Sequence, residues 1–171
     1  MEINRIWAMP NSKTFTIKPI KELIERHISN GEIWVDPFVR DSIFKSQCKF
    51  TNDLNPEISA THNLEALEFL RKIESNSVDG LLFDPPYSFR QIMECYNGIG
   101  RQVFQTDTNG SFYADKKIEI ARIIKPNGIV ICCGWNSMGI GKTRGFVMQE
   151  ILLVPHGGSK NDTICTVERK V

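Results

Sequence analysis

The chain has 171 residues, of which 41% are hydrophobic and 24% charged, and this composition is typical of one globular domain with a full core. Its formal net charge at pH 7 is only +1, which argues against a protein that coats nucleic acid through a global basic field. No apolar stretch approaches the length of a membrane span, and the first ten residues lack the apolar core of a signal peptide. We therefore expect a single domain over residues 1–171, with no membrane partner.

The cysteines indicate a reducing compartment. They are odd in number, and no pair of them has the spacing of a zinc site: Cys48, Cys95, Cys132, Cys133 and Cys165. Two of them, Cys132 and Cys133, lie in an apolar run and are expected to be buried in a strand. We expect a cytoplasmic protein without a bound metal.

Helical and extended patterns alternate along the chain. The expected elements are helix 19–28, strand 32–35, strand 48–52, helix 64–73, strand 78–83, helix 115–124 and strand 129–133. Residues 146–154 and 163–169 flank His156-Gly157-Gly158 and are expected to form a terminal hairpin. Residues 88–114 are mixed in character and show no clean period. This alternation predicts an α/β fold with a mostly parallel sheet and an antiparallel final strand.

Three acidic residues follow expected strands directly. They are Asp36, Asp53 and Asp84. Because ligands of open α/β sheets bind at the carboxyl ends of the strands, this placement predicts a functional site there.

The most informative motif is Asp84-Pro85-Pro86-Tyr87, which follows the buried strand 78–83. Two prolines fix two φ angles and remove two backbone donors, so the loop is stiff and presents acceptors. The Asp84 carboxylate and the Pro85 carbonyl can accept the two N–H groups of an exocyclic amine, and Tyr87 can stack on a base. The alternative is a rigid turn with an N-terminal aspartate cap.

This tetrad resembles the catalytic signature (D/N/S)PP(Y/F/W) of the amino-methyltransferases. Further segments resemble that family in consistent order between about residues 15 and 135. They are residues 18–28 (KPIKELIERHI), 35–38 (VDPF), 52–57 (NDLNPE), 64–70 (LEALEFL) and 124–128 (IKPNG). The resemblance implies a Rossmann-like class I methyltransferase fold and S-adenosyl-L-methionine as cofactor.

The same resemblance implies which residues hold the cofactor. Asp53 is in the place of the acid that binds the ribose hydroxyls, Asp36 can pair with the methionine ammonium, and Lys18 can pair with its carboxylate. The full implied cofactor-binding set is Lys18, Asp36, Pro37, Phe38, Asp53, Leu54 and Glu65. Three of these residues have an ordinary alternative: Lys18 as a solvated charge, Asp53 as a turn acid and Glu65 as an acid at a helix start.

One departure from the family pattern bears on the cofactor. The family pattern is DPFxGxG, with glycines at the positions of Arg40 and Ser42, whereas this chain has Val39-Arg40-Asp41-Ser42 after Phe38. Those glycines normally let the backbone approach the cofactor. The interval between Asp36 and Asp53 is also short, so any helix there must be short or missing. A non-catalytic subunit that keeps the fold is therefore an alternative to an enzyme.

The aspartate at the first position of the tetrad favours adenine N6 in DNA as the methylated atom, by resemblance. An RNA enzyme acting on adenine N6 or guanine N2 stays open, because the same tetrad serves RNA enzymes. No separate target-recognition domain is visible, so a homodimer or a specificity partner is expected to help read the target. Within the chain, the candidates for nucleic-acid contact lie in residues 88–114: Arg90, Tyr96, Arg101 and Phe104.

A basic segment near the C-terminus is a second candidate for phosphate contact. It comprises Lys142, Thr143 and Arg144 beside glycines. A complete P-loop would need glycine at 136, where the chain has Asn136, so ATP binding is not expected.

Overall fold

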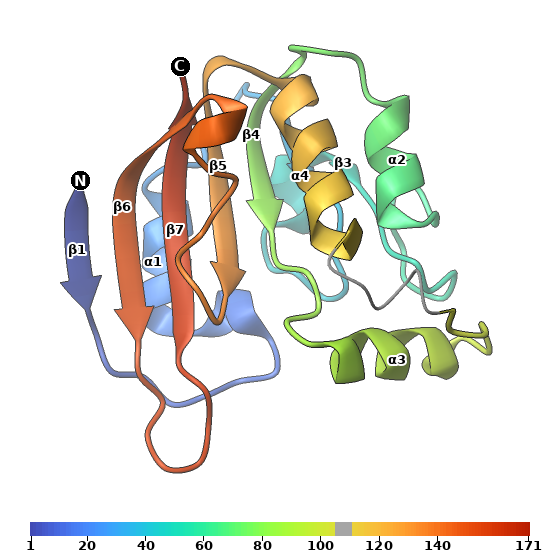
Figure 1. Cartoon of the computed structure of the whole chain (residues 1–171), viewed down its shortest axis with the longest axis horizontal. Coiled ribbons are helices and arrows are strands. Elements are labelled where there is room, and N and C mark those ends of the chain that lie inside the picture. Colours follow the sequence, from blue (N-terminus) through green and yellow to red (C-terminus); the bar gives the residue numbers. More distant parts are fainter. Residues whose placement is uncertain (105–110) are drawn as a thin grey trace.

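The computed structural model describes residues 1–104 and 111–171 (Figure 1). The strands are β1 (Glu2–Arg5), β2 (Trp34–Asp36), β3 (Cys48–Thr51), β4 (Val78–Phe83), β5 (Ile124–Gly134), β6 (Phe146–Val154) and β7 (Thr163–Lys170). The α-helices are α1 (Lys18–Glu25), α2 (Ala66–Lys72), α3 (Phe89–Gly98) and α4 (Ser111–Ile123). Short 3-10 turns are η1 (Thr14–Thr16), η2 (Lys45–Gln47) and η4 (Lys142–Arg144).

The strands form one seven-stranded sheet in the order β1-β6-β7-β5-β4-β2-β3. All neighbouring pairs are parallel except the two that involve β7, which runs antiparallel to both β5 and β6. The predicted parallel sheet with an antiparallel final strand is therefore confirmed.

Two hydrophobic clusters cover the two faces of the sheet. Side chains alternate along each strand, so Leu82 of β4 packs with α1 on one face while Leu81 packs with α2 and α4 on the other. Both faces of the central strands are covered, which explains the continuous apolar runs of β4 and β5.

Several element bounds differ from those expected. Strand β1 was not predicted, and α3 lies in residues 88–114, where no clean period is visible. Helix α4 begins at Ser111, earlier than expected, and α1 ends at Glu25, before Ile28. Helix α3 nevertheless has local signals: the Ser88 side chain caps its first turn by accepting the N–H of Gln91, and Ile92 and Tyr96, four residues apart, form one buried face against Phe112 of α4.

The arrangement of the sheet positions the candidate site. Only η2 lies between β2 and β3, in agreement with the expectation that a helix there is short or missing. Figure 1 shows α3 beside the end of the sheet toward which the arrowheads of β4 and β5 point. Among the described residues, no helix is long and apolar enough to cross a membrane.

Candidate functional site

The three acids predicted at strand ends lie at one edge of the sheet. Asp36 is the last residue of β2, Asp53 follows β3, and Asp84 follows β4. The charges of Asp84 and Asp53 both raise the pKa of Asp36, so the three carboxyl groups act on one another. The prediction that they gather at the carboxyl ends of parallel strands agrees with this placement.

Asp36 is fully buried and only half satisfied. The backbone N–H of Phe38 donates to its Oδ1 at 3.0 Å, whereas Oδ2 has no hydrogen-bond partner among the described residues. Burial, reinforced by repulsion from Asp84, raises the pKa of Asp36 to about 7. A buried carboxylate oxygen without a donor is costly in the protein alone, and it is an acceptor for a cationic or N–H group of a ligand.

Asp53 anchors the turn that follows β2. Its Oδ2 accepts the backbone N–H of Arg40 at 3.0 Å, and its Oδ1 accepts that of Asn55 at 2.8 Å. The buried amide of Asn52 adds a second link, since its Nδ2 donates to the Pro37 carbonyl at 3.2 Å. This connection fixes residues 36–40 against the end of β3.

The turn after β2 contains a residue with positive φ that is not a glycine. Arg40 has a φ of 37°, in the left-handed region, and the family pattern has its first glycine at this position. Phe38 packs its ring edge-on against Phe83 with centroids 5.8 Å apart, and buried Pro37 precedes it. Leu54, on the far side of Asp53, packs with Ile92 and its neighbours.

In the Asp84-Pro85-Pro86-Tyr87 loop, the Tyr87 hydroxyl donates a hydrogen bond to Oδ1 of Asp84. Burial raises the pKa of Asp84, and the nearby hydroxyls of Tyr87 and Thr14 lower it in part. The pKa of Tyr87 is well above its ordinary value because of burial and the Asp84 charge, so its hydroxyl stays a donor. Pro85 is buried, and the Pro86 carbonyl accepts the Tyr113 hydroxyl at 2.6 Å. The loop is therefore held from both sides.

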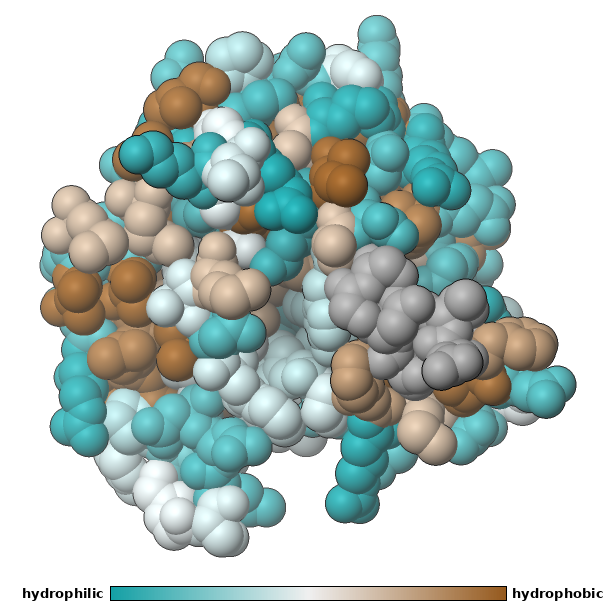
Figure 2. Space-filling model, viewed as in Figure 1, coloured by the Kyte–Doolittle hydropathy of each residue, from teal (hydrophilic) through white to brown (hydrophobic). Residues whose placement is uncertain are grey.

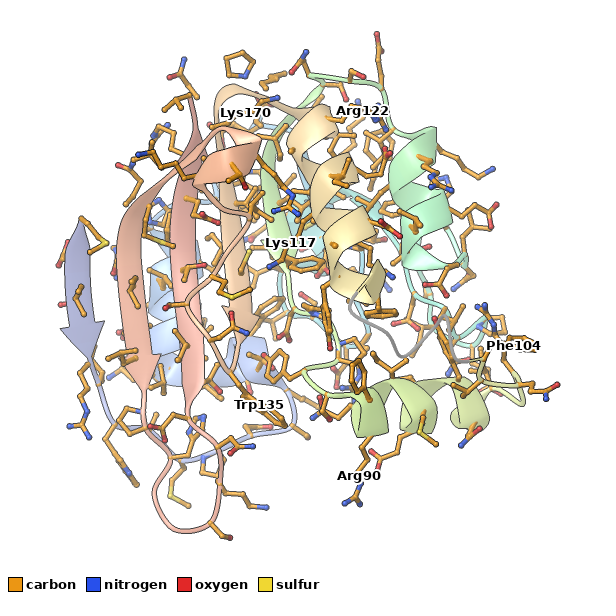
Figure 3. The ribbon with its side chains drawn as sticks, viewed as in Figure 1. Arg90, Phe104, Lys117, Arg122, Trp135 and Lys170 are labelled. Atoms are coloured by element: carbon orange, nitrogen blue, oxygen red, sulfur yellow. The ribbon has the colours of Figure 1, made fainter. Side chains whose placement is uncertain are left out.

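Trp135 belongs to this site, and the sequence analysis did not identify it. It follows β5, and its ring meets that of Tyr87 at 5.8 Å between centroids and 68° between planes. The residue is 40% exposed, and Figure 3 shows it at the end of the sheet near the start of α3. Because β5 pairs with β4, residues just after the two strands come together, and this register was the available signal.

A small cavity of about 30 Å³ lies between the N-terminal segment and the turn after β2. Its lining includes Thr14, Phe38, Arg40, Asp41 and Asp84. An ion pair of 2.9 Å between Lys13 and Asp41 joins its two walls.

Two of the predicted cofactor residues have other partners. Lys18 has an 86% exposed side chain and lies 3.9 Å from Glu22 within α1. Glu65 accepts hydrogen bonds from the Tyr96 hydroxyl at 2.8 Å and from Arg101 at 2.9 Å, and its Oε1 lies 3.5 Å from Nζ of buried Lys116. Its carboxylate therefore links α2 to α3 and α4.

The candidates for nucleic-acid contact divide between two ends of the molecule. Arg90 lies on α3 and pairs with Glu94 at 2.8 Å; Figure 3 shows it pointing away from the body of the protein. Phe104 is 56% exposed, and Figure 2 shows hydrophobic surface over the region of α3. The 142–144 segment is η4, at the opposite end of the sheet in Figure 1, so it does not join the Asp84 site.

No protein-family model matches the sequence, and no curated protein matches it significantly. Solved structures match the fold. TrmN from Thermus thermophilus superposes with a TM-score of 0.56 at 14% identity, over 91% of this chain and 49% of that one. The Burkholderia thailandensis 1,6-didemethyltoxoflavin-N1-methyltransferase, which contains S-adenosylhomocysteine, gives 0.57 at 12% identity, over 90% and 77%. A putative methyltransferase in complex with the Haloferax volcanii Trm112 activator gives 0.53 at 12% identity, over 88% of each chain.

The chain thus spans about half the length of TrmN. At these identities the comparison establishes the architecture, and the chain has the expected Rossmann-like methyltransferase fold.

Proposed function

We propose that the chain binds S-adenosylmethionine and transfers its methyl group to an exocyclic amino nitrogen of a nucleobase. The specific target that we propose is N6 of adenine in DNA. The observation that carries the proposal is the position of Asp84. Its half-buried carboxylate begins a rigid double-proline loop at the end of β4, next to the half-satisfied Asp36.

The residues around Asp36 fit the polar groups of the cofactor. The free Oδ2 of Asp36 is a ready acceptor for the methionine ammonium. Each oxygen of Asp53 accepts one backbone N–H, and a carboxylate oxygen has a second lone pair, so the ribose hydroxyls can still be bound. Pro37, Phe38 and Leu54 supply apolar surface beside these acids. When bound, the cofactor would supply an activated methyl group on a sulfonium sulfur, which would leave as a neutral thioether while the methylated nitrogen releases one proton to solvent.

The catalytic residues act by positioning and electrostatics. Asp84 and the Pro85 carbonyl accept the two N–H groups of the target amine, which localises its lone pair toward the methyl group. This requires Asp84 in its ionised form, and because the Tyr87 hydroxyl bonds only Oδ1, the other carboxylate oxygen can accept the N–H of the target amine. The exposed ring of Trp135 next to Tyr87 offers a face for a base that has been flipped out of a duplex.

The choice of adenine in DNA comes from the aspartate of the tetrad. We assign recognition of the target sequence to the exposed side of α3, which carries Arg90, and to Phe104 after this helix. A second copy of the chain or a specificity partner would extend this surface.

A second candidate function is a non-catalytic subunit. It is favoured by Arg40, whose positive φ stands where the family pattern has glycine in the cofactor turn.

Two measurements test the proposal together. Calorimetry with S-adenosylhomocysteine measures cofactor binding, and radiolabelled methyl transfer compares unmethylated DNA with an RNA of the same sequence. Binding with transfer to DNA is the expected result. Binding without transfer to either polymer supports the non-catalytic subunit, and transfer to RNA alone supports the RNA enzyme.

A further inference from the structure

Arg40 has a backbone conformation that an arginine rarely adopts. Among the described residues, three that are not glycine have positive φ, and the other two are asparagines, which tolerate it better: Arg40, Asn76 and Asn127. The Arg40 N–H is fixed by Asp53 at 3.0 Å, so the conformation is maintained by the surrounding structure. A strained residue that the fold maintains at a functional edge indicates a functional use.

The charge environment of Arg40 is acidic. It lies along the same cavity as Asp84 and Asp41, and Asp36 is four residues before it in the same turn. Lys13, the other cation along this cavity, is paired with Asp41 at 2.9 Å. The Arg40 guanidinium makes no ion pair with any residue in the two described segments, and the residue is exposed.

The resemblance suggests Lys18 as the cation that binds the carboxylate of the cofactor. Lys18 is a largely exposed side chain near Glu22 on α1. The cofactor's amino-acid end carries one ammonium and one carboxylate. Asp36 provides an acceptor for the ammonium, and a cation on the same turn would complete the pair. A guanidinium suits this task, because its planar fork donates two parallel hydrogen bonds to a carboxylate.

We propose that Arg40 binds the α-carboxylate of the cofactor's methionine end, in the place where related turns have glycine. This inference rests on the proposed function, because it presupposes cofactor binding at the Asp36 turn. Arg40 would then increase the affinity only for ligands that carry the carboxylate, and it would not affect the affinity for ligands that lack it.

The test uses calorimetry with two ligands, S-adenosylhomocysteine and its decarboxylated analogue, on the wild type and on Arg40→Gln, Arg40→Lys and Arg40→Gly. The Gly variant relieves the backbone strain, so it separates the side chain from the turn. Arg71→Gln, on the exposed side of α2, is the matched control.

The expected result is a loss of about 10-fold or more in S-adenosylhomocysteine affinity for Arg40→Gln and Arg40→Gly, the scale of a charged hydrogen bond. Arg40→Lys should lose less, the decarboxylated analogue should bind wild type and variants equally, and Arg71→Gln should match the wild type. An unchanged or higher affinity of Arg40→Gly would overturn the inference, because the side chain would then be neutral or obstructive. Equal losses for both ligands would also overturn it. If the wild type binds neither ligand, the proposed function itself fails.

Discussion

The Tyr87 hydroxyl donates a hydrogen bond to the carboxylate of Asp84, the group assigned to hold the target amine. This bond lowers the pKa of Asp84, against the larger effect of burial, which raises it. The tyrosine therefore favours the ionised form of Asp84, and Oδ2 of the same carboxylate is left to accept from the target amine.

The first prediction concerns Tyr87→Phe. Removing the hydroxyl removes an interaction that lowers the Asp84 pKa, so that pKa rises. Because the ionised carboxylate is the active form, the acid limb of the kcat/KM profile should move to higher pH. The measurement is the pH dependence of methyl transfer from about pH 5 to 9, which covers the range in which catalytic acids and bases usually titrate. An acid limb that stays in place would show that Asp84 is not the group that titrates.

The raised pKa of Asp36 leads to opposite pH dependences for the stability of the protein and for its cofactor affinity. Its pKa is raised to about 7, above the ordinary value of about 3.9 for an aspartate, so the folded state retains a proton that the unfolded state loses. The wild type should therefore lose stability as pH rises between those two values. Relative to Asp36→Asn, which does not titrate, this loss amounts to about 2 kcal/mol from pH 5 to pH 8.

Denaturant unfolding at several pH values measures this difference without cofactor. Cofactor affinity should show the opposite trend and rise with pH through about 7, because the ammonium pairs with ionised Asp36. Parallel stability curves for wild type and Asp36→Asn would contradict the burial assigned to this carboxyl group.

Trp135 should matter for the target base and not for the cofactor. Trp135→Ala removes the exposed ring beside Tyr87, and kcat/KM for DNA should fall by about 10- to 100-fold, the scale of base stacking. S-adenosylhomocysteine affinity should stay unchanged, and Trp135→Phe should retain most of the activity. The matched control is Trp7→Ala, a 60% exposed indole on the N-terminal segment. Equal effects of the two alanine variants would remove Trp135 from the site.

The mostly parallel sheet with its antiparallel final strand and the acidic strand ends were predictable because they follow from local patterns and from the alternation of helices and strands. Buried strands such as 78–83 are readable as apolar runs, and a parallel arrangement then brings residues such as Asp36 and Asp84 to one edge. The positive φ of Arg40 was not predictable, since arginine does not favour it and the bond from its N–H to Asp53 spans two strand ends.

Contacts between distant segments explain the other differences. Trp135 meets Tyr87 only because β5 lies beside β4. The omission of helix α3 has another cause, because its local signals were present and were missed: Ser88 caps the first turn, and Ile92 and Tyr96, four residues apart, form the face that packs on Phe112.

The contacts of Glu65 also join segments that are distant in the sequence, and they lead to a prediction about stability. Its carboxylate accepts bonds from Tyr96 and Arg101 and lies 3.5 Å from Nζ of Lys116, which is 3% exposed. Glu65→Ala should lower the free energy of unfolding by about 1–3 kcal/mol, because a buried cation loses an acidic partner. The control is Glu68→Ala, which removes an exposed ion pair with Lys72 on the same helix. A large loss of cofactor affinity with unchanged stability would contradict this prediction and would support a role for Glu65 in cofactor binding.

The central claim is that Asp84 directs methyl transfer to adenine N6 in DNA. The most direct measurement incubates unmethylated DNA with S-adenosylmethionine and the protein, digests the DNA to nucleosides and identifies the methylated product by mass spectrometry. Asp84→Ala serves as the control, and its S-adenosylhomocysteine affinity is measured in parallel. The account predicts N6-methyladenine with the wild type, a loss of at least about 100-fold with Asp84→Ala and little change in cofactor affinity. Methylcytosine as the sole product, methylation confined to RNA, or full activity in Asp84→Ala would contradict it.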